Sequence, residues 1–282
     1  MPPTRDPRPI ADALLSDTEM VTEMVMALEI VQFPCRSDNY GVLLHEAESG
    51  ETASIDAPDA AAVLRVLSEK GWTLTDIFTT HHHTDHVEGN LALKEATGCR
   101  ITGPALEADR IPGIDRQIGD GDSFDFAGHR VRVIATPGHT LGHVAYHLPD
   151  DRLAFVADTL FALGCGRVFE GTLDEMFASV ENIGALPPET ILYCGHEYTE
   201  ANFRFAITRD PENAALIARG EEIRRLRAEG KPTLPTTVAI ERATNPYLRA
   251  AMPALRAAAG LPEGSPAEVF AATRRAKDSF KG

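Results

Sequence analysis

Hydrophobic residues recur along the chain with two different spacings, and the first part of the chain alternates between them. Short apolar runs rich in β-branched residues predict strands, and apolar residues spaced three and four apart predict helices. The predicted helices are residues 59–70, 87–97 and 173–183. The predicted strands are residues 28–33, 42–44, 52–55, 75–79, 99–102, 123–126, 129–135, 144–148, 153–156 and 191–194.

The pattern changes near residue 198, after which only helical spacing is found. Segments rich in Ala, Arg and Glu predict helices at residues 199–208, 211–229, 245–257 and 266–278. Residues 231–237, which contain two prolines, predict a linker between helices. We therefore expect three parts: an N-terminal extension (1–26), a mixed α/β domain (27–198) and a helical domain (199–282).

Composition excludes several classes of protein. The 282 residues are 43% hydrophobic and 24% charged, which is typical of a globular protein, and the net charge is −15. An acidic chain is a poor binder of nucleic acid or of anionic membrane. No apolar run approaches the ~18 residues of a membrane span, and residues 1–25 lack an apolar signal segment and carry acids that argue against a mitochondrial presequence. We expect a cytoplasmic monomer with a small-molecule partner and four reduced, buried cysteines.

The main chemical signal is the sequence His81-His82-His83-Thr84-Asp85-His86, directly after a predicted strand. In an extended segment His81 and His83 point to the same side and can chelate one ion, while His82 faces away. Asp85 and His86 follow where the chain turns and can reach a second ion. Such clustering of imidazole and carboxylate groups indicates a metal site.

Three more candidate ligands each follow a predicted strand: His139, Asp158 and His196. Seven imidazole and carboxylate ligands are too many for one tetrahedral ion and predict two divalent ions, with zinc favoured and iron or manganese as alternatives. We do not expect the remaining histidines to be ligands, although His143 is a candidate for hydrogen-bonding support of a ligand. They are His45, His129, His143 and His147.

Two neighbouring cations can bind one water between them and lower its pKa from ~15.7 towards neutrality, which makes hydroxide available to attack a carbonyl. We count Asp85 and Asp158 as catalytic as well as ligating. The chain has no G-x-S-x-G motif, so a serine nucleophile is not expected. The residues alone leave the scissile bond open among β-lactams, phosphodiesters, lactones and thioesters.

This ligand pattern resembles the metallo-β-lactamase superfamily, and residues 33–40, 158–172 and 194–199 resemble its glyoxalase II (hydroxyacylglutathione hydrolase) branch. The resemblance implies an αββα sandwich followed by a small helical substrate-binding domain, and hydrolysis of S-D-lactoylglutathione to glutathione and D-lactate by a metal-bridging hydroxide. It also implies a role for each of the seven ligands. The first ion is assigned to His81, His83 and His139, the second to Asp85, His86 and His196, and Asp158 bridges both.

The resemblance further implies a set of substrate contacts. Arg274 and Lys277 share a helix face and are expected to bind the glycyl carboxylate of glutathione, although basic residues near a helix C-terminus also complement the helix dipole. Arg167 stands where the family usually has Lys, and Phe169 where many members have Tyr, which removes one hydroxyl. Tyr198 matches another substrate-contacting tyrosine of the family.

Two alternatives compete with thioester hydrolysis. One is a persulfide dioxygenase of the same superfamily, which would hold a single iron and lack a helical domain ending in R-x-x-K. The other is a metal-binding or redox-sensing module without activity, which the complete ligand set disfavours. The sequence therefore favours a hydrolase.

Overall fold

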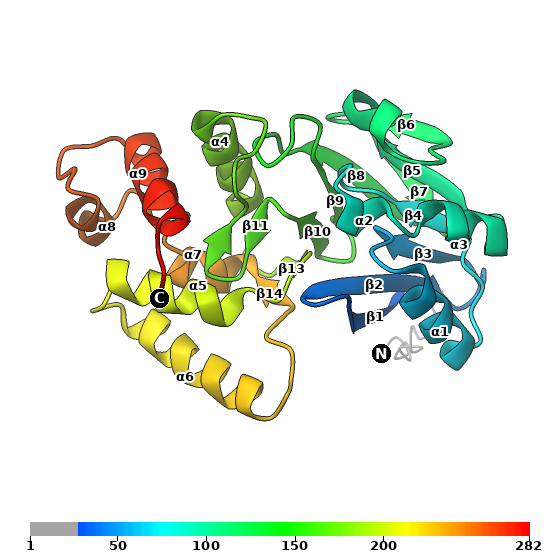
Figure 1. Cartoon of the computed structure of the whole chain (residues 1–282), viewed down its shortest axis with the longest axis horizontal. Helices are drawn as coiled ribbons and strands as arrows, with labels where there is room; N and C mark the ends of the chain where they lie inside the picture. The colour runs from blue at the N-terminus through cyan, green and yellow to red at the C-terminus, as the bar shows by residue number, and fades with distance from the viewer. Residues whose placement is uncertain (1–27) are drawn as a thin grey trace, which may run out of the picture.

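The computed structural model describes residues 28–282, and the predicted N-terminal extension lies outside them. Two six-stranded sheets pack face to face, and side chains from both sheets interleave in one core that includes Leu44, Phe78, Val133, Tyr146 and Phe155. Helices cover the two outer faces. The predicted αββα sandwich is confirmed, and the C-terminal helices lie at one end of it (Figure 1).

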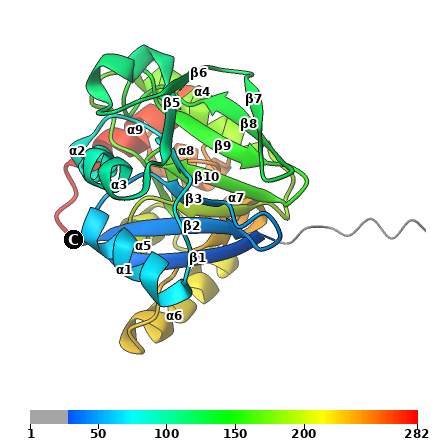
Figure 2. The same ribbon diagram turned by 90° about the vertical axis from the view of Figure 1, so that its right-hand side faces the viewer.

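The first sheet carries the strand that leads into the metal-ligand motif. Its strand order follows the sequence, antiparallel between the first three strands and parallel thereafter. The strands are β1 (Leu28–Cys35), β2 (Asn39–Glu46), β3 (Thr52–Ile55), β4 (Asp76–Phe78), β5 (Arg100–Pro104) and β6 (Arg116–Ile118). Helices α1 (Ala60–Lys70) and α3 (Asn90–Thr97) bury their apolar faces on this sheet and stand in front of it in Figure 2.

The second sheet carries the later candidate ligands at the ends of its strands. In sheet order its strands are β14 (Thr236–Thr237), β13 (Ile191–Cys194), β10 (Leu153–Ala157), β9 (Val144–Leu148), β8 (His129–Ala135) and β7 (Ser123–Phe126). Along β10, Leu153 and Phe155 enter the core between the sheets, while Ala154 and Val156 pack in the outer core with helix α4 (Leu173–Gly184). This alternation is the period of two that a strand requires.

The C-terminal region is helical, as predicted. It contains α5 (Thr199–Arg209), α6 (Ala214–Ala228), α7 (Val238–Thr244), α8 (Pro253–Ala258) and α9 (Pro266–Asp278). These helices lie beside a short hairpin of β11 (Leu160–Phe161) and β12 (Gly164–Cys165), which follows Asp158 in the sequence. Along the described part of the chain, no helix combines the length and apolarity needed to cross a membrane.

Two predicted helices were wrong in their limits. The helix at 87–97 is interrupted, because α2 (Thr84–Val87) ends before Gly89, whose missing Cβ lets it approach the Ala57 carbonyl. The helix at 245–257 does not exist as one element. Asn245 is extended, as expected for a residue before proline, and α8 begins only at Pro253. The predicted linker at 231–237 ends in β14. The 3-10 helix η1 (Ala105–Arg110), strand β6, the β11–β12 hairpin and helix α7 were not predicted.

Candidate metal centre

One cluster of imidazoles comes from two loops at the same end of the sandwich. His81 and His83 follow β4 on an extended segment, and His139 lies in the loop after β8. Nε2 of His81 is 3.1 Å from Nδ1 of His83, and that nitrogen is 3.0 Å from Nε2 of His139. The three nitrogen atoms thus lie close enough together to surround one ion.

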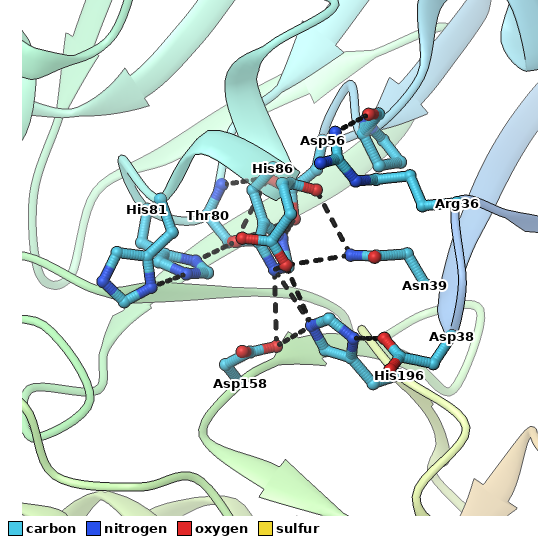
Figure 3. Close-up of polar contacts among 12 residues, drawn as sticks. Arg36, Asp38, Asn39, Asp56, Thr80, His81, His86, Asp158 and His196 are labelled. Atoms are coloured by element: carbon cyan, nitrogen blue, oxygen red, sulfur yellow. Dashed lines mark hydrogen bonds and ion pairs between the residues drawn. The ribbon is translucent and has the colours of Figure 1, made fainter.

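A second cluster lies beside the first. It consists of Asp85 and His86 from α2 and His196 from the loop after β13, with the Nε2 atoms of the two imidazoles 3.4 Å apart. Asp158 stands between the clusters. Its Oδ1 is 3.5 and 3.4 Å from Nε2 of His86 and His196, and its Oδ2 is 3.3 Å from Nε2 of His139. Figure 3 shows His86, His196 and Asp158 turned towards one another.

The donor atoms at this centre suit divalent cations. Oδ1 of Asp158 is buried and has no hydrogen-bond partner among residues 28–282, and a buried carboxylate oxygen without a partner is costly. The nitrogens of His81, His83 and His139 face each other, although each pair can share at most one proton. Lone pairs of several side chains therefore converge here. The residues fit metal binding.

Carboxylates and a carbonyl fix the orientation of three of the imidazoles. Nδ1 of His86 contacts Asp56 at 2.7 Å, and Nδ1 of His196 contacts Asp38 at 2.9 Å, both visible in Figure 3. Nδ1 of His139 donates to the Arg167 carbonyl at 2.8 Å. Such partners fix which ring nitrogen faces the metal. Asp38 and Asp56 were not predicted from the sequence, although Asp56 directly follows strand β3, as Asp158 follows β10.

The other histidines lie outside the ligand clusters. His143 is fully buried, and its Nε2 accepts the backbone N–H of Asp158 at 3.3 Å, which fits the predicted supporting role. His82 turns away from the metal side, as predicted, and contacts Glu107. His45 stacks on Trp72, and His129 and His147 are buried in the second sheet.

The pKa values of the clustered groups follow from burial and neighbouring charge. Burial, reinforced by His139, lowers the pKa of His83 to about 4, so that this imidazole is neutral at pH 7, the form that binds metal. Burial would raise the pKa of Asp158, but His86 and His196 outweigh it and hold this pKa well below its usual range. Burial opposes the charged form of His86, yet Asp158 and Asp56 raise its pKa to about 9. A metal ion competes with that proton for Nε2.

A cavity of about 470 Å³ opens over the metal centre. The α/β region and the helical region both contribute walls, and the five predicted substrate residues all line it. Its lining includes His83, Asp85, His139, Asp158, His196, Phe161, Cys165, Arg167, Phe169, Tyr198, Arg274 and Lys277. Phe169 is 60% exposed with its ring edge-on to His83 and His139, and Tyr198 stacks in parallel on His196 at 4.8 Å.

The two cations of α9 differ in their surroundings. Arg274 is 6% exposed, and its guanidinium donates to the Cys165 carbonyl at 2.9 Å and to Asp278 at 2.8 Å. Lys277 is only partly buried and donates to the Ala201 carbonyl at 3.0 Å. Burial, helped by the positive charge of Arg274, lowers the pKa of Lys277 to about 8. Arg274 therefore also holds the cavity wall, whereas Lys277 is freer to meet a ligand.

Comparison with known proteins matches both parts of the chain. The model of the metallo-beta-lactamase superfamily matches residues 47–196, and that of the hydroxyacylglutathione hydrolase C-terminus matches residues 197–280. The hydroxyacylglutathione hydrolase of Rhizobium meliloti is 59% identical, over 90% of this chain and 99% of that protein. Its counterpart in Brucella anthropi is 58% identical, over 90% of this chain and 97% of that protein.

Solved structures share the fold at lower identity. ETHE1 from Myxococcus xanthus has a TM-score of 0.62 and 24% identity, covering 89% of this chain and 91% of that one. The B3 metallo-beta-lactamase BLEG-1 has a TM-score of 0.60 and 22% identity, covering 78% of this chain and 99% of that one. These two likenesses support the fold alone.

Proposed function

Since this chain belongs to the hydroxyacylglutathione hydrolases of the metallo-beta-lactamase superfamily, we propose that it hydrolyses S-D-lactoylglutathione to glutathione and D-lactate at a centre of two divalent ions. The observation that carries this proposal is the single cavity lined by both ligand clusters and by the cations Arg167, Arg274 and Lys277. The match of residues 197–280 to the hydrolase C-terminus favours hydrolysis over the persulfide dioxygenase alternative.

The ligand assignment follows the two clusters. His81, His83 and His139 would hold one ion, Asp85, His86 and His196 the other, and Asp158 would bridge them. We propose zinc, and iron or manganese suit the same imidazole and carboxylate donors. Bound together, two such ions supply an activated water and polarise the thioester carbonyl.

The remaining residues of the cavity bind and orient the substrate. Lys277 and Arg167 offer cations to the carboxylates of glutathione. Tyr198 presents its ring and hydroxyl beside His196, while Phe169 covers His83 and His139 with an apolar surface. The departing thiolate needs no strong general acid, because a free thiol has a pKa of ~8.5.

The proposal is tested with the full-length protein, by following thiol and D-lactate release from S-D-lactoylglutathione together with elemental analysis. We expect about two metal ions per chain, loss of turnover after chelation, and recovery on adding Zn²⁺. Full activity without bound metal would refute the metal mechanism. Oxygen consumption with glutathione persulfide, without thioester cleavage, would favour the dioxygenase instead. The monomeric state and cytoplasmic location stay predictions.

A further inference from the structure

A buried carboxylate outside the ligand clusters joins the two loops that carry the first cluster. Glu107 lies in η1, and its side chain is 1% exposed. Its Oε2 accepts the backbone N–H of His82 at 2.7 Å and lies 2.7 Å from the Nδ1 atom of the same residue. Its Oε1 accepts the backbone N–H of Gly142 at 2.8 Å. Both carboxylate oxygens are therefore engaged.

The two backbone donors lie close to the candidate ligands. His82 is the residue between His81 and His83, so its N–H belongs to the segment that presents both imidazoles. Gly142 lies in the same loop as His139, three residues further along. One backbone bond, from the Val144 N–H to the Thr80 carbonyl at 3.0 Å, joins the chain beside these two loops. Glu107 adds a second tie, which acts within the loops themselves.

The close approach of Glu107 requires glycine at position 142. A Cβ at Gly142 would lie 2.5 Å from Cγ of Glu107, which is shorter than any ordinary contact. The neighbouring Leu141 N–H is accepted by Glu170 at 3.1 Å, and Glu170 is paired with Arg110. Two successive backbone N–H groups of the His139 loop thus donate to carboxylates. The carboxylate of Glu107 is more deeply buried than that of Glu170.

The same region could instead be interpreted as a metal site formed by His82, Glu107 and Glu170, but the contacts of these residues fit that interpretation less well. Their ligand atoms are close enough to surround an ion. However, both oxygens of Glu107 already accept backbone N–H groups, and Arg110 binds both oxygens of Glu170. The charge of Glu170 is therefore already balanced by Arg110, and both oxygens of Glu107 already have hydrogen-bond partners.

We propose that Glu107 is a positioning residue that sets the spacing of His81 and His83 relative to His139, and thereby the affinity of the first metal position. This inference rests on the metal centre proposed above. A partner that orients metal ligands typically contributes about 10- to 100-fold in metal affinity. A carboxylate is needed because the two backbone N–H groups meet different oxygens of Glu107. In glutamine one of these positions is an NH2 group, which donates and cannot accept.

The test is Glu107→Gln, which keeps the size of the side chain but removes one acceptor. Zn²⁺ and Co²⁺ affinities are measured by competition with a coloured chelator, together with the visible spectrum of the cobalt protein. We expect one of the two metal equivalents to bind about 10- to 100-fold more weakly, with an altered cobalt spectrum. The matched control is Glu46→Gln, another buried carboxylate that accepts two backbone N–H groups, in the turn between β2 and β3.

Wild-type affinity of both equivalents in Glu107→Gln would overturn the proposal, as would an equal loss in Glu46→Gln. If Glu107→Gln does not fold, Gly142→Ala tests the same tie by pushing Glu107 aside without changing charge, and the same weakening of one equivalent is expected. Wild-type protein that binds no metal would instead refute the proposed function, so the two failures are distinguishable.

Discussion

Two sides of the cavity are held in place by different parts of the chain. We call the two ligand clusters with Asp158 the floor, and the β11–β12 hairpin beside them the wall. At the floor, the imidazoles of His86 and His196 are oriented by Asp56 and Asp38, and both carboxylates belong to the α/β region. The wall is the β11–β12 hairpin, whose backbone is bound by side chains of the helical region. The donors to its carbonyls are Asn202 to Ala162, Asn245 to Phe161 and Gly164, and Arg274 to Cys165.

This difference suggests that the α/β region positions the groups for chemistry, while the helical region shapes the part of the cavity that binds the substrate. Glu241, fully buried in α7, also accepts the Leu163 N–H, so the hairpin depends on the helical region for its shape. The hairpin in turn contributes Phe161 and Cys165 to the cavity. We therefore expect changes at the floor to reduce kcat, and changes in the helical region to alter stability and KM.

The largest effect should come from the floor. Asp158→Ala removes the only carboxylate that reaches both clusters among the described residues, and we expect kcat to fall on the order of 10³-fold. Metal content should drop below that of the wild type. Steady-state kinetics and elemental analysis of the same sample measure both. An undiminished kcat in this variant would contradict the assignment of the chemistry to the floor and of substrate binding to the helical region.

Changes to the residues that hold the wall should lower the stability of the protein. Asn245→Ala leaves two buried carbonyls of the hairpin without their donor, and we expect the free energy of unfolding to fall by about 2–3 kcal/mol. Denaturant unfolding measures it. As a control, Asp59→Ala removes the N-cap of α1 and should cost only about 1 kcal/mol with unchanged KM. Equal costs for the two variants would argue against a special role for Asn245.

Substrate binding should depend on the freer cation of α9. Lys277→Ala is expected to raise KM about tenfold with little change in kcat, since a charge-assisted contact to a partly exposed group is worth about 1.5 kcal/mol. Arg275→Ala is the control, because it removes an equal charge from the same helix outside the cavity. An unchanged KM in Lys277→Ala would count against the carboxylate contact.

The pH dependence of KM sharpens the same point. Since the pKa of Lys277 is about 8, its positive charge is present at pH 7 and is lost as the pH rises through 8. KM of the wild type should therefore rise above pH 8, after correction for spontaneous thioester hydrolysis. Lys277→Arg keeps its charge and should show a flatter profile; parallel profiles would assign the rise to another group.

The smallest effect is expected at Phe169. Its ring lies edge-on to His83 and His139 at the exposed mouth of the cavity. Phe169→Tyr adds a hydroxyl, and one hydrogen bond in partly exposed surroundings should lower KM by about threefold or less. A change above tenfold would mean that this position, rather than α9, dominates recognition.

The sequence alone determined the candidate ligands and the division into an α/β part and a helical part, because both are written in local patterns. The αββα layering was an implication of the family resemblance. Apolar runs with a period of two define strands, and His81, Asp158 and His196 each stand just beyond such a run. Asn245 is different, because helical spacing in the sequence predicts a helix that starts there, whereas the chain becomes helical again only at Pro253. Its side chain instead binds hairpin carbonyls more than 80 residues away in the chain.

Only the tertiary structure decided which groups support the ligands. Asp38 and His196 are separated by 158 positions, and Glu107 acts on two loops that precede and follow it. The residues next to a position in the sequence predict whether its side chain is buried. They do not predict which distant atom that side chain contacts. The candidate ligands could be found from the sequence because each is a ligand-type residue at a strand end or in the motif that follows one. The partners that orient them are defined by distance in space, which only folding sets.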